Sequence, residues 1–245
     1  MPNENLSIAL WMPVLNEIKG LQVILPQIDR MLFSEVIAID GGSTDGTIEF
    51  CEKAGVTVLR QPNRGMPDAM DFAYSKTSAD IIIVFTPDGN SLPDVLPTLC
   101  AKMRDGYDLV IVSRYLAGAE SHDDGFVTGL GNQIFTAMVS RIFGVRYTDV
   151  LVAYRGYKRS AIEKMSLANH TKEHWLRRKF FYMNGWELGS AIRAARLGLR
   201  IAEIPGNEPP RIGGKSKLSI FKNGFGSLFQ ILFDLIYFKT SSKTS

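Results

Sequence analysis

The sequence predicts an α/β fold with a mostly parallel sheet and helices on both faces. Three short apolar runs carry this prediction, at Glu35–Asp40, Asp80–Phe85 and Asp108–Val112. Each run is rich in apolar β-formers and is separated from the next by segments with helical spacing. Continuous apolar strands of this kind are typical of parallel sheets that are buried on both faces.

Length and composition exclude several classes of protein. The chain has 245 residues, of which 45% are hydrophobic and 22% are charged. These values exclude a disordered chain, a collagen-like fibre and a multi-span membrane protein. The net charge of +3 is too small to indicate a nucleic-acid partner, because that partner requires a clustered basic face.

The first half of the chain alternates strands and helices. Further strands are predicted at Leu6–Val14 and Val56–Leu59. Helical spacing occurs at Glu17–Leu32, Asp45–Ala54, Pro67–Ser75 and Leu92–Met103. The second half is more helical, with an amphipathic segment and three shorter helices at Asp123–Gly144, Lys158–Met165, Lys172–Met183 and Trp186–Leu197. Its predicted strands are Thr148–Arg155 and Arg200–Ile204.

The cysteines and the N-terminus predict the compartment. Cys51 and Cys100 form no CxxC pair and no metal-type spacing with histidine, so we expect free thiols in a reducing compartment. The first residues, Met1–Asn5, are polar and lack the features of a signal peptide. We therefore expect a cytoplasmic protein.

Polar and glycine residues follow four of the predicted strands, where an open α/β sheet binds its ligands. Asp40 ends one strand and precedes a Gly-Gly-Ser-Thr-Asp-Gly-Thr turn. This turn is either a capped strand–helix connection or a place where Asp40 contacts the base or ribose of a nucleotide. The turn matches neither the P-loop nor the GxGxxG dinucleotide pattern.

Two further segments suit phosphate chemistry. Asp88 and Asn90 lie two residues apart after the most apolar strand. Their oxygens can therefore converge on Mg²⁺ or Mn²⁺. The alternative is an ordinary Asp-Gly turn. The loop Arg211–Lys217 has three cations, a hydroxyl and two glycines, and is either a phosphate-binding loop or a solvated basic surface.

Together, these segments resemble glycosyltransferase family 2, within it the dolichol-phosphate (polyprenol-phosphate) mannosyltransferase-like group. Seven stretches match in the family's order and span about four-fifths of the chain: Met12–Glu17, Val36–Thr47, Phe85–Asp94, Val112–Ala119, Gly131–Thr136, Tyr147–Arg159 and Gly198–Leu218. The resemblance implies a GT-A fold that binds a nucleotide sugar. It implies a glycosyltransferase domain over residues 1–217, with a nucleotide-sugar half (1–116) and an acceptor half (117–217), followed by residues 218–245 as an amphipathic helix and tail.

The resemblance also implies roles for individual residues. Asp88 falls on the second aspartate of the family's D-x-D metal motif, and Asn90 falls where a glutamine lies beside the metal. Arg114 resembles an arginine that contacts the diphosphate or the acceptor phosphate. The remaining implied donor-binding residues are Pro13, Leu15, Glu17, Asp40, Pro87, Arg211, Lys215, Ser216 and Lys217.

Two positions depart from the family pattern. The first aspartate of D-x-D is Thr86, an uncharged and weaker ligand. Either the divalent cation binds less tightly, or the sugar nucleotide itself supplies most of its ligands. The usual second aspartate of the preceding D-D-G-S turn is Gly41, which puts one nucleotide contact and the base preference in question. A nucleotide-sugar-binding protein without turnover therefore stays an alternative.

The family inverts the configuration of the transferred sugar. A lipid-phosphate acceptor is already ionised, whereas a saccharide hydroxyl needs a carboxylate base. Glu187 lies roughly where family members with hydroxyl acceptors carry that base; the alternative is a surface glutamate in the first turn of a helix. We expect a GDP- or UDP-sugar donor and a polyprenyl or dolichyl phosphate acceptor, with a saccharide hydroxyl as the alternative acceptor.

The C-terminal segment Leu218–Phe238 is long enough to cross a bilayer, but Lys222, Asn223 and Asp234 argue against that. It is predicted either to lie in the membrane interface or to be a core helix or an oligomer contact. An interfacial helix would place the enzyme peripherally on the cytoplasmic membrane face. A homo-oligomer is the other partner that this segment predicts.

Overall fold

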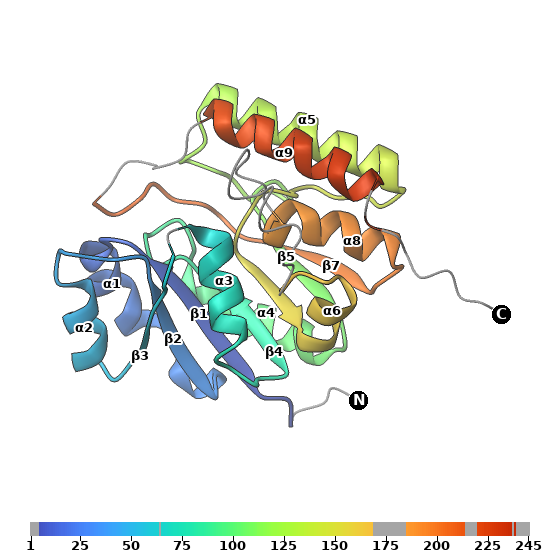
Figure 1. Ribbon diagram of the computed structural model, residues 1–245. Coiled ribbons are helices and arrows are strands. Elements are labelled where there is room, and N and C mark those ends of the chain that lie inside the picture. The colour runs from blue at the N-terminus through green and yellow to red at the C-terminus, as the bar shows by residue number, and fades with distance from the viewer. Residues whose placement is uncertain (1–4, 64, 169–184, 214–219, 237, 239–245) are drawn as a thin grey trace.

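The computed structural model describes residues 5–63, 65–168, 185–213, 220–236 and 238 (Figure 1). Seven strands form one sheet in the order β3-β2-β1-β4-β6-β5-β7. Their bounds are β1 Ile8–Val14, β2 Glu35–Asp40, β3 Thr57–Arg60, β4 Ile81–Val84, β5 Leu109–Ser113, β6 Arg155–Lys158 and β7 Ile201–Pro205. All neighbouring pairs are parallel except those of β6, which runs antiparallel to β4 and β5.

Helices cover both faces of the sheet. The α-helices are α1 Ile18–Ile24, α2 Thr47–Lys53, α3 Met66–Tyr74, α4 Leu96–Arg104, α5 Phe126–Phe143, α6 Arg159–Lys164, α8 Ser190–Arg196 and α9 Ile220–Ile236. Short 3-10 helices η1, η2 and η3 span Leu25–Gln27, Arg30–Leu32 and Pro93–Val95, and a π-helix, η4, spans Gly185–Gly189. Within the described residues, we find no helix that combines the length and apolar character needed to cross a bilayer.

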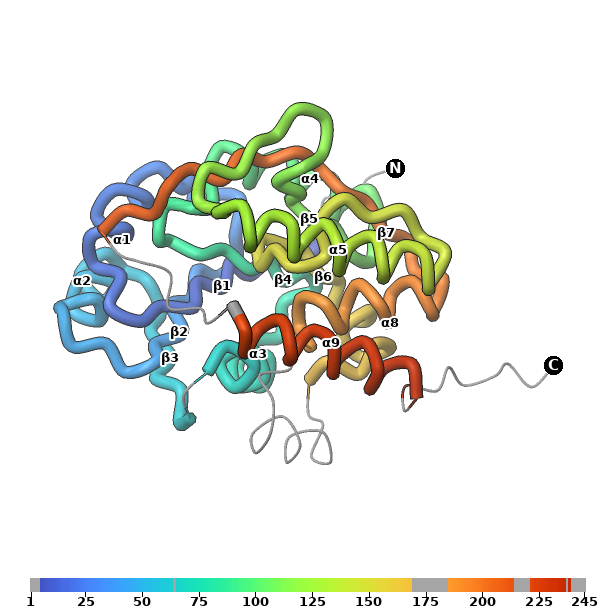
Figure 2. Tube along the Cα trace, turned by 90° about the horizontal axis from the view of Figure 1, so that it is seen from above, coloured from blue at the N-terminus to red at the C-terminus, as the bar shows by residue number. Residues whose placement is uncertain are grey.

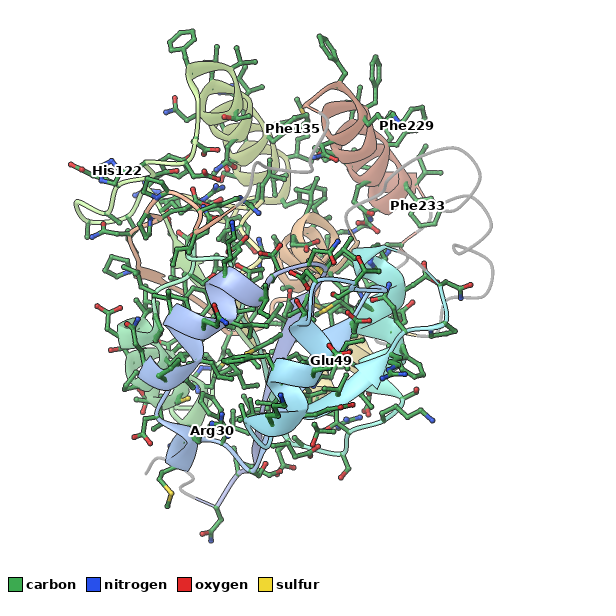
Figure 3. All side chains as sticks on the ribbon, turned by 90° about the vertical axis from the view of Figure 1, so that its left-hand side faces the viewer. Arg30, Glu49, His122, Phe135, Phe229 and Phe233 are labelled. Carbon is green, nitrogen blue, oxygen red and sulfur yellow. The ribbon has the colours of Figure 1, made fainter. Side chains whose placement is uncertain are left out.

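The long helices α5 and α9 lie side by side at one end of the molecule (Figures 1 and 2). The view in Figure 3 places them together at the top, with Glu49 of α2 and Arg30 toward the opposite end. Strands β6 and β7 come from the predicted acceptor half, yet they pair with β4 and β5 of the first half. The two halves therefore share one sheet.

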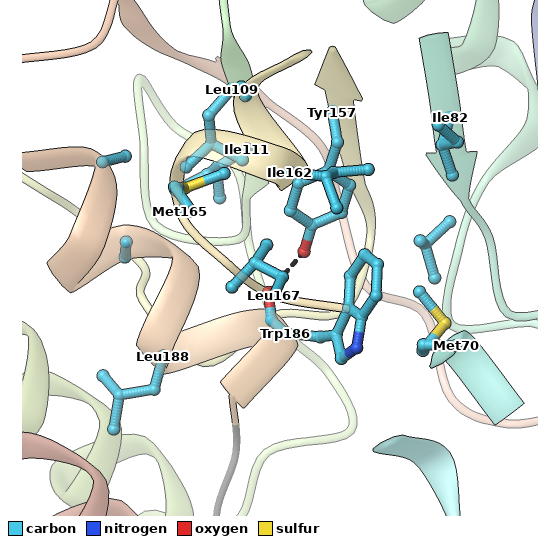
Figure 4. Packing of buried hydrophobic residues seen from close by; sticks show 14 of the residues in the cluster. Met70, Ile82, Leu109, Ile111, Tyr157, Ile162, Met165, Leu167, Trp186 and Leu188 are labelled. Atoms are coloured by element: carbon cyan, nitrogen blue, oxygen red, sulfur yellow. Dashed lines mark hydrogen bonds between the residues drawn. The ribbon is translucent and has the colours of Figure 1, made fainter. Parts of the chain in front are cut away.

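Two apolar layers sandwich the sheet. On one face of the sheet, apolar strand residues pack against α1, α2 and α4. On the opposite face, they pack against α3, α5, α6 and α8. In the second layer the Tyr157 hydroxyl donates to the Trp186 carbonyl at 2.5 Å, and the two rings meet edge to face (Figure 4). The Trp186 indole N–H donates to Asp71 of α3. These contacts fix η4, which carries Glu187, against the sheet.

The structure confirms the α/β fold and corrects two predicted elements. The predicted helix Glu17–Leu32 ends as α1 at Ile24, because Pro26 has no amide hydrogen to continue it and a 3-10 turn follows. The predicted strand Thr148–Arg155 is wrong over 148–154; the amides of Thr148 and Asp149 are bound by the Glu203 carboxylate instead of a neighbouring strand. The predicted helix at 172–183 lies outside the described residues.

Candidate functional site

The turn after β2 is held rigidly by its own aspartate. Asp40 is buried, and its carboxylate accepts hydrogen bonds from the amides of Gly42 and Ser43 at 2.9 and 3.0 Å. The end of β1 locks onto the same turn, since the Asn16 amide donates to the Ser43 hydroxyl and the Thr44 amide donates to the Asn16 side chain. The carboxyl ends of β1 and β2 thus form one preorganised edge.

An open cleft of about 510 Å³ lies at this edge. Its lining joins the turn after β2 to α2 and to the segment after β3, and consists of Asp40, Gly41, Gly42, Ser43, Ile48, Glu49, Arg60, Gln61, Pro62 and Asn63. Pro13, Leu15 and Glu17 lie at the end of β1, outside this lining. The polar residues after β3 were missed by the sequence analysis, because nothing in their local pattern distinguishes them from a surface turn.

The turn after β4 carries the predicted cation ligands Asp88 and Asn90, both buried. The Asn90 amide donates to Asp88 Oδ1 at 3.2 Å, and the Asn90 side-chain NH₂ donates to the Pro209 carbonyl at 3.3 Å. Asn90 Oδ1 is buried without a hydrogen-bond partner in the described part of the chain. A buried amide oxygen without a partner is costly, and amide and carboxylate oxygens are the ligands that Mg²⁺ and Mn²⁺ prefer. The turn fits a divalent cation.

The protein supplies few ligands for such an ion. The Thr86 hydroxyl shares a hydrogen bond of 2.9 Å with the Ser91 hydroxyl inside the turn. Across the described residues, no group of three or more His, Cys, Asp or Glu side chains could hold a metal. A cation at Asp88 would therefore depend on oxygens from its ligand, as is usual for metal ions that accompany diphosphates.

Two glycines permit the close packing of this turn. A Cβ on Gly20 of α1 would lie 2.2 Å from the Pro87 carbonyl oxygen, so only glycine lets α1 approach the turn. Gly89 has a φ of +97° and would place a Cβ 2.8 Å from the Ile212 side chain. The Ile212 amide donates to the Asp88 carbonyl at 2.7 Å. The first residues of the basic loop are thereby packed on the turn.

Arg211 pairs with the predicted cation ligand Asp88. Its Nη1 is 2.6 Å from Asp88 Oδ2, and its Nε is 3.2 Å from Asp123 Oδ2. Arg211 therefore joins the donor edge to the loop before α5. Lys215, Ser216 and Lys217 of the same predicted loop lie outside the described residues.

Arg114, at the end of β5, is surrounded by carboxylates. Its Nε and Nη2 bind Asp149 bidentately at 2.7 and 3.1 Å, and its Nη1 lies 3.3 Å from Asp124 and 3.1 Å from Glu208. Asn132 of α5 donates to Asp149 at 2.9 Å. Arg114 thus forms ion pairs with three carboxylates from three separate segments. We call Arg114 and these three acids, Asp124, Asp149 and Glu208, the Arg114 cluster.

Burial and charge act against each other in this cluster. Burial alone would raise the pKa of Asp149, but the charge and hydrogen bonds of Arg114, with those of Asn132, hold it below the usual value. For Glu208, burial dominates and raises the pKa, although Arg114 and Ser121 oppose it. Burial and the hydrogen bond to Asp124 raise the pKa of Tyr115 to about 12. The sequence analysis identified Arg114 but missed Glu208 as its partner.

Glu187 lies in η4 and is half-buried. Its carbonyl accepts hydrogen bonds from Arg155 at 2.6 Å and from the Ser190 hydroxyl at 2.9 Å. Arg155 is fully buried and also donates to the Val150 and Val152 carbonyls. The backbone of the π-helix is therefore fixed from the sheet, and π-helical turns of this kind are frequent at functional sites.

A mostly parallel sheet of seven strands, with one antiparallel strand inserted and helices on both faces, is the architecture of the GT-A fold. Residues 10–166 match the family described as Glycosyl transferase family 2. The chain belongs to this family and is a glycosyltransferase. The resemblance predicted from seven separate motifs is confirmed.

Named relatives and solved structures agree with this assignment. The chain is 27% identical over 219 residues to a dolichyl-phosphate hexose transferase of Haloferax volcanii, covering 89% of each chain. It is 25% identical over 241 residues to the undecaprenyl-phosphate 4-deoxy-4-formamido-L-arabinose transferase of Salmonella paratyphi B, covering 94% of this chain and 66% of that one. Glucosyl-3-phosphoglycerate synthase of Mycobacterium tuberculosis, crystallised with Mn²⁺, UDP and phosphoglyceric acid, has the same fold. It superposes with a TM-score of 0.69 at 21% identity, covering 97% of this chain and 81% of that one.

Proposed function

We propose that this family 2 enzyme transfers a sugar, with inversion, from a GDP- or UDP-sugar to a polyprenyl or dolichyl phosphate. The Asp88–Asn90 turn carries the donor part of the proposal, because it offers a buried carboxylate paired with Arg211 and a buried amide oxygen that has no hydrogen-bond partner among the described residues. The names of the two prenyl-phosphate relatives support the acceptor part. The cleft between the ends of β2 and β3 is the proposed site of the nucleoside.

Asp88 and Asn90 would hold Mg²⁺ or Mn²⁺. When bound, that cation would stabilise the charge that develops on the leaving diphosphate. Arg211 would give up Asp88 and pair with a phosphate oxygen of the donor, for which its planar guanidinium is well suited. Lys215, Ser216 and Lys217 are proposed to complete this phosphate-binding loop, and Pro13, Leu15, Glu17, Asp40 and Pro87 to border the donor.

The acceptor chemistry follows from the charge of the nucleophile. An ionised phosphate oxygen would attack the anomeric carbon as the bond to the diphosphate oxygen breaks, and no proton needs to be removed. This agrees with an acceptor side whose carboxylates at 124, 149 and 208 are all bound to Arg114. To act as a phosphate ligand, Arg114 would have to exchange one of these carboxylates for the phosphate.

Transfer to a saccharide hydroxyl is the second candidate. The observation that favours it is the half-buried Glu187 in a fixed π-helical turn, where a carboxylate could serve as the base. Glu187→Gln distinguishes the two, because it would abolish transfer to a hydroxyl but leave transfer to a phosphate largely intact. A donor-binding protein without turnover is the third outcome, which Thr86 and Gly41 keep open.

The first experiment is a thermal-shift panel with UDP, GDP, UDP-glucose, UDP-N-acetylglucosamine and GDP-mannose, each with and without Mn²⁺. A ligand that binds only the native state raises the melting temperature. We expect a metal-dependent shift for one base, followed by transfer of that sugar to polyprenyl phosphate. Binding without transfer to any acceptor would support the non-catalytic alternative.

We further propose that the enzyme acts in the cytoplasm, with residues 218–238 in peripheral contact with the cytoplasmic membrane face. The two cysteines are free and buried, which agrees with a reducing compartment. A homo-oligomer through the same segment is the competing proposal. Flotation with lipid vesicles tests the first, and light scattering of the free protein tests the second.

A further inference from the structure

Arg114 has more negative partners than its single positive charge can balance. Its guanidinium pairs with Asp149, Asp124 and Glu208, at 2.7, 3.3 and 3.1 Å. An anionic acceptor can therefore bind Arg114 only if one of these carboxylates leaves or loses its charge. The three acids differ in how firmly the rest of the protein holds them, and this difference identifies the acid that can exchange.

Asp149 is a fixed partner. Its side chain is fully buried and binds Arg114 through both oxygens, at 2.7 and 3.1 Å. Asn132 and the amide of Leu151 donate to the same carboxylate, at 2.9 and 3.2 Å. Burial opposes ionisation, yet the charge and hydrogen bonds of Arg114 hold the pKa of Asp149 below its ordinary value. The ionised carboxylate is thus well stabilised where it lies.

Asp124 is also held by more than the arginine. It lies in the turn before α5 and accepts a hydrogen bond from the Tyr115 hydroxyl. Burial and this bond raise the pKa of Tyr115 to about 12, so the hydroxyl keeps its proton at neutral pH. The Asp124 amide donates to the Ser121 hydroxyl at 3.2 Å. Departure of Asp124 would therefore leave Tyr115 without this acceptor and disturb the start of α5.

Glu208 has a fixed backbone but a side chain that can turn away. Its amide donates to the Glu120 carbonyl at 2.9 Å, and its carbonyl accepts from the His122 amide at 2.8 Å. His122 marks this loop in Figure 3. The Glu208 carboxylate accepts from Arg114 Nη1, at 3.1 and 3.3 Å, and from the Ser121 hydroxyl. Rotation about the side-chain bonds of glutamate can withdraw this carboxylate while the backbone stays paired.

Burial and solvent access also favour exchange of Glu208 rather than Asp149. Burial raises the pKa of Glu208, although Arg114 and Ser121 oppose this. The ionised form of Glu208 is therefore less well stabilised than that of Asp149, whose pKa is lowered. The Glu208 side chain is 14% exposed, whereas that of Asp149 is 0% exposed. A ligand from solvent thus reaches Arg114 on the side of Glu208.

We infer that Glu208 selects the acceptor, because its carboxylate occupies the place on Arg114 that an acceptor phosphate takes and turns away when the phosphate binds. A phosphate with two negative charges can replace one carboxylate on a guanidinium, whereas a neutral hydroxyl cannot. Glu208 therefore weakens the binding of every phosphate acceptor and excludes uncharged acceptors from Arg114. The inference rests on the proposed function and adds the residue that sets the affinity and charge of its acceptor.

Calorimetric titration of the full chain with geranyl phosphate, a short prenyl phosphate, tests the inference. Glu208→Gln keeps the length of the side chain and an oxygen for the Ser121 hydroxyl, but it removes the charge. We expect this variant to bind geranyl phosphate about tenfold more tightly than the wild type, because the competing ion pair is lost. Geraniol, which has no phosphate, should show no such gain.

Glu120→Gln is the matched control, because it removes one negative charge from the facing loop without touching Arg114. Glu120 pairs with His122 at 3.4 Å, and its side chain is 71% exposed. The control should bind geranyl phosphate as the wild type does. An equal gain in Glu120→Gln would reduce the effect to overall charge and overturn the inference.

Transfer kinetics separate selection by Glu208 from a structural role. With the donor identified in the thermal-shift panel, Glu208→Gln should lower the KM for geranyl phosphate about tenfold and leave kcat nearly unchanged. A damaged fold would lower kcat instead. The melting temperature and the affinity for nucleoside diphosphate should stay near those of the wild type, because Glu208 does not contact the donor edge.

The gain should also depend on pH. The charged groups that face the Glu208 side chain are Arg114 and Asp124, and its backbone is paired with the loop of Glu120 and His122. Protonated Glu208 no longer competes for Arg114, so the two proteins should bind equally once pH falls below the native pKa of Glu208, which is above 4.5. The ionisation of the phosphate is common to both proteins and cancels in the ratio of their affinities.

Equal or weaker binding of geranyl phosphate by Glu208→Gln would overturn the inference, as would a gain in Asp124→Asn instead. Transfer by the wild type with the same KM in Glu208→Gln would reject selection by Glu208 and keep the proposed function. Tighter binding by the variant, without transfer by either protein, would reject transfer to prenyl phosphate and keep the competition at Arg114. Absence of binding by both proteins would overturn the inference together with the acceptor part of the proposed function.

Discussion

The donor edge and the Arg114 cluster are built in opposite ways. At the donor edge, Asp40 and Asp88 bind amides within three residues of themselves in the chain. In the Arg114 cluster, the arginine binds acids that are 10, 35 and 94 residues away in sequence. These short-range bonds shape the donor turns locally, with long-range support from Asn16 and Arg211, whereas the cluster has only long-range bonds and holds three distant segments together. A substitution in the cluster should therefore affect folding first, and one at the donor edge should affect binding first.

Loss of Arg114 should have the largest effect. Arg114→Ala leaves three carboxylates together with low exposure, at 0–20% of their side chains, and breaking such a network costs about 3–5 kcal/mol of unfolding free energy. Urea denaturation measures the loss. Arg60→Ala is the control, since Arg60 and its partner Glu52 are 70% and 57% exposed and 3.9 Å apart. That pair should contribute less than about 1 kcal/mol. Similar losses for both variants would contradict the contrast.

Asp149 tests the cluster by pH. Asp149→Asn should lower the unfolding free energy by about 1.5–3 kcal/mol at neutral pH, because it removes charged hydrogen bonds to Arg114. The native pKa of Asp149 is below the ordinary value of 3.8. Its contribution is thus complete above that value and is lost as pH falls through the native pKa. Urea titrations at several pH values should show the gap between wild type and variant closing below 3.8; a gap independent of pH would refute this role.

A pair of glycines tests the packing of the donor edge. Gly20→Ala forces a Cβ against the Pro87 carbonyl, at 2.2 Å. We expect a cost of about 1–3 kcal/mol and weaker cation-dependent nucleotide binding as the turn shifts. Gly131→Ala in α5 is the control, because a Cβ there meets no described atom within 4 Å. Thermal melts and nucleotide titrations of both variants provide the measurement, and equal behaviour would count against the close approach.

Substitution of Arg211 should produce the smallest effect, and it should change the affinities for Mn²⁺ and for nucleoside diphosphate in opposite directions. If Arg211 occupies the cation position at Asp88, Arg211→Gln should raise the affinity for Mn²⁺ alone about threefold to tenfold. The same variant should lower the affinity for nucleoside diphosphate in saturating Mn²⁺ by about tenfold, since a charged hydrogen bond to phosphate is lost. Calorimetry with Mn²⁺ alone and then with the diphosphate separates the two signs. A fall in both affinities would mean that Arg211 does not compete with the cation.

The same contrast explains what could be predicted from the sequence. The β4 strand, the turn with Asp88 and Asn90, and the turn after Asp40 were predicted because their signals lie within a few adjacent residues. The partners of Arg114 could not be paired, because Asp149 and Glu208 are brought to it by tertiary structure alone. The antiparallel insertion of β6 and the π-helical turn at Glu187 likewise depend on long-range packing rather than on local pattern.

The apolar helix near the C-terminus was predicted from the sequence, but the side of it that packs against the protein was not. Hydrophobic spacing identified a helix over 218–238 and left its surroundings open between interface, core and oligomer. Only the tertiary structure shows that Asp234 pairs with the buried Arg193, while Phe221 and Phe225 of α9 are exposed. The hydrophobic periodicity of the sequence shows that the helix has a polar and an apolar face. The ion pair between Asp234 and Arg193 then determines that the polar face of α9 is the buried one.

The central claim is that the turn at Asp88 binds a divalent cation together with a nucleoside diphosphate. Calorimetric titration of UDP and GDP into the wild type and Asp88→Asn, with and without Mn²⁺, tests it most directly. Asn matches Asp in shape but removes the charge, so the fold and the hydrogen bond from Asn90 can persist. We predict tight, Mn²⁺-dependent binding of one diphosphate by the wild type and a loss of about a hundredfold in the variant. Equal affinity in the two proteins, or binding indifferent to Mn²⁺, would contradict the account.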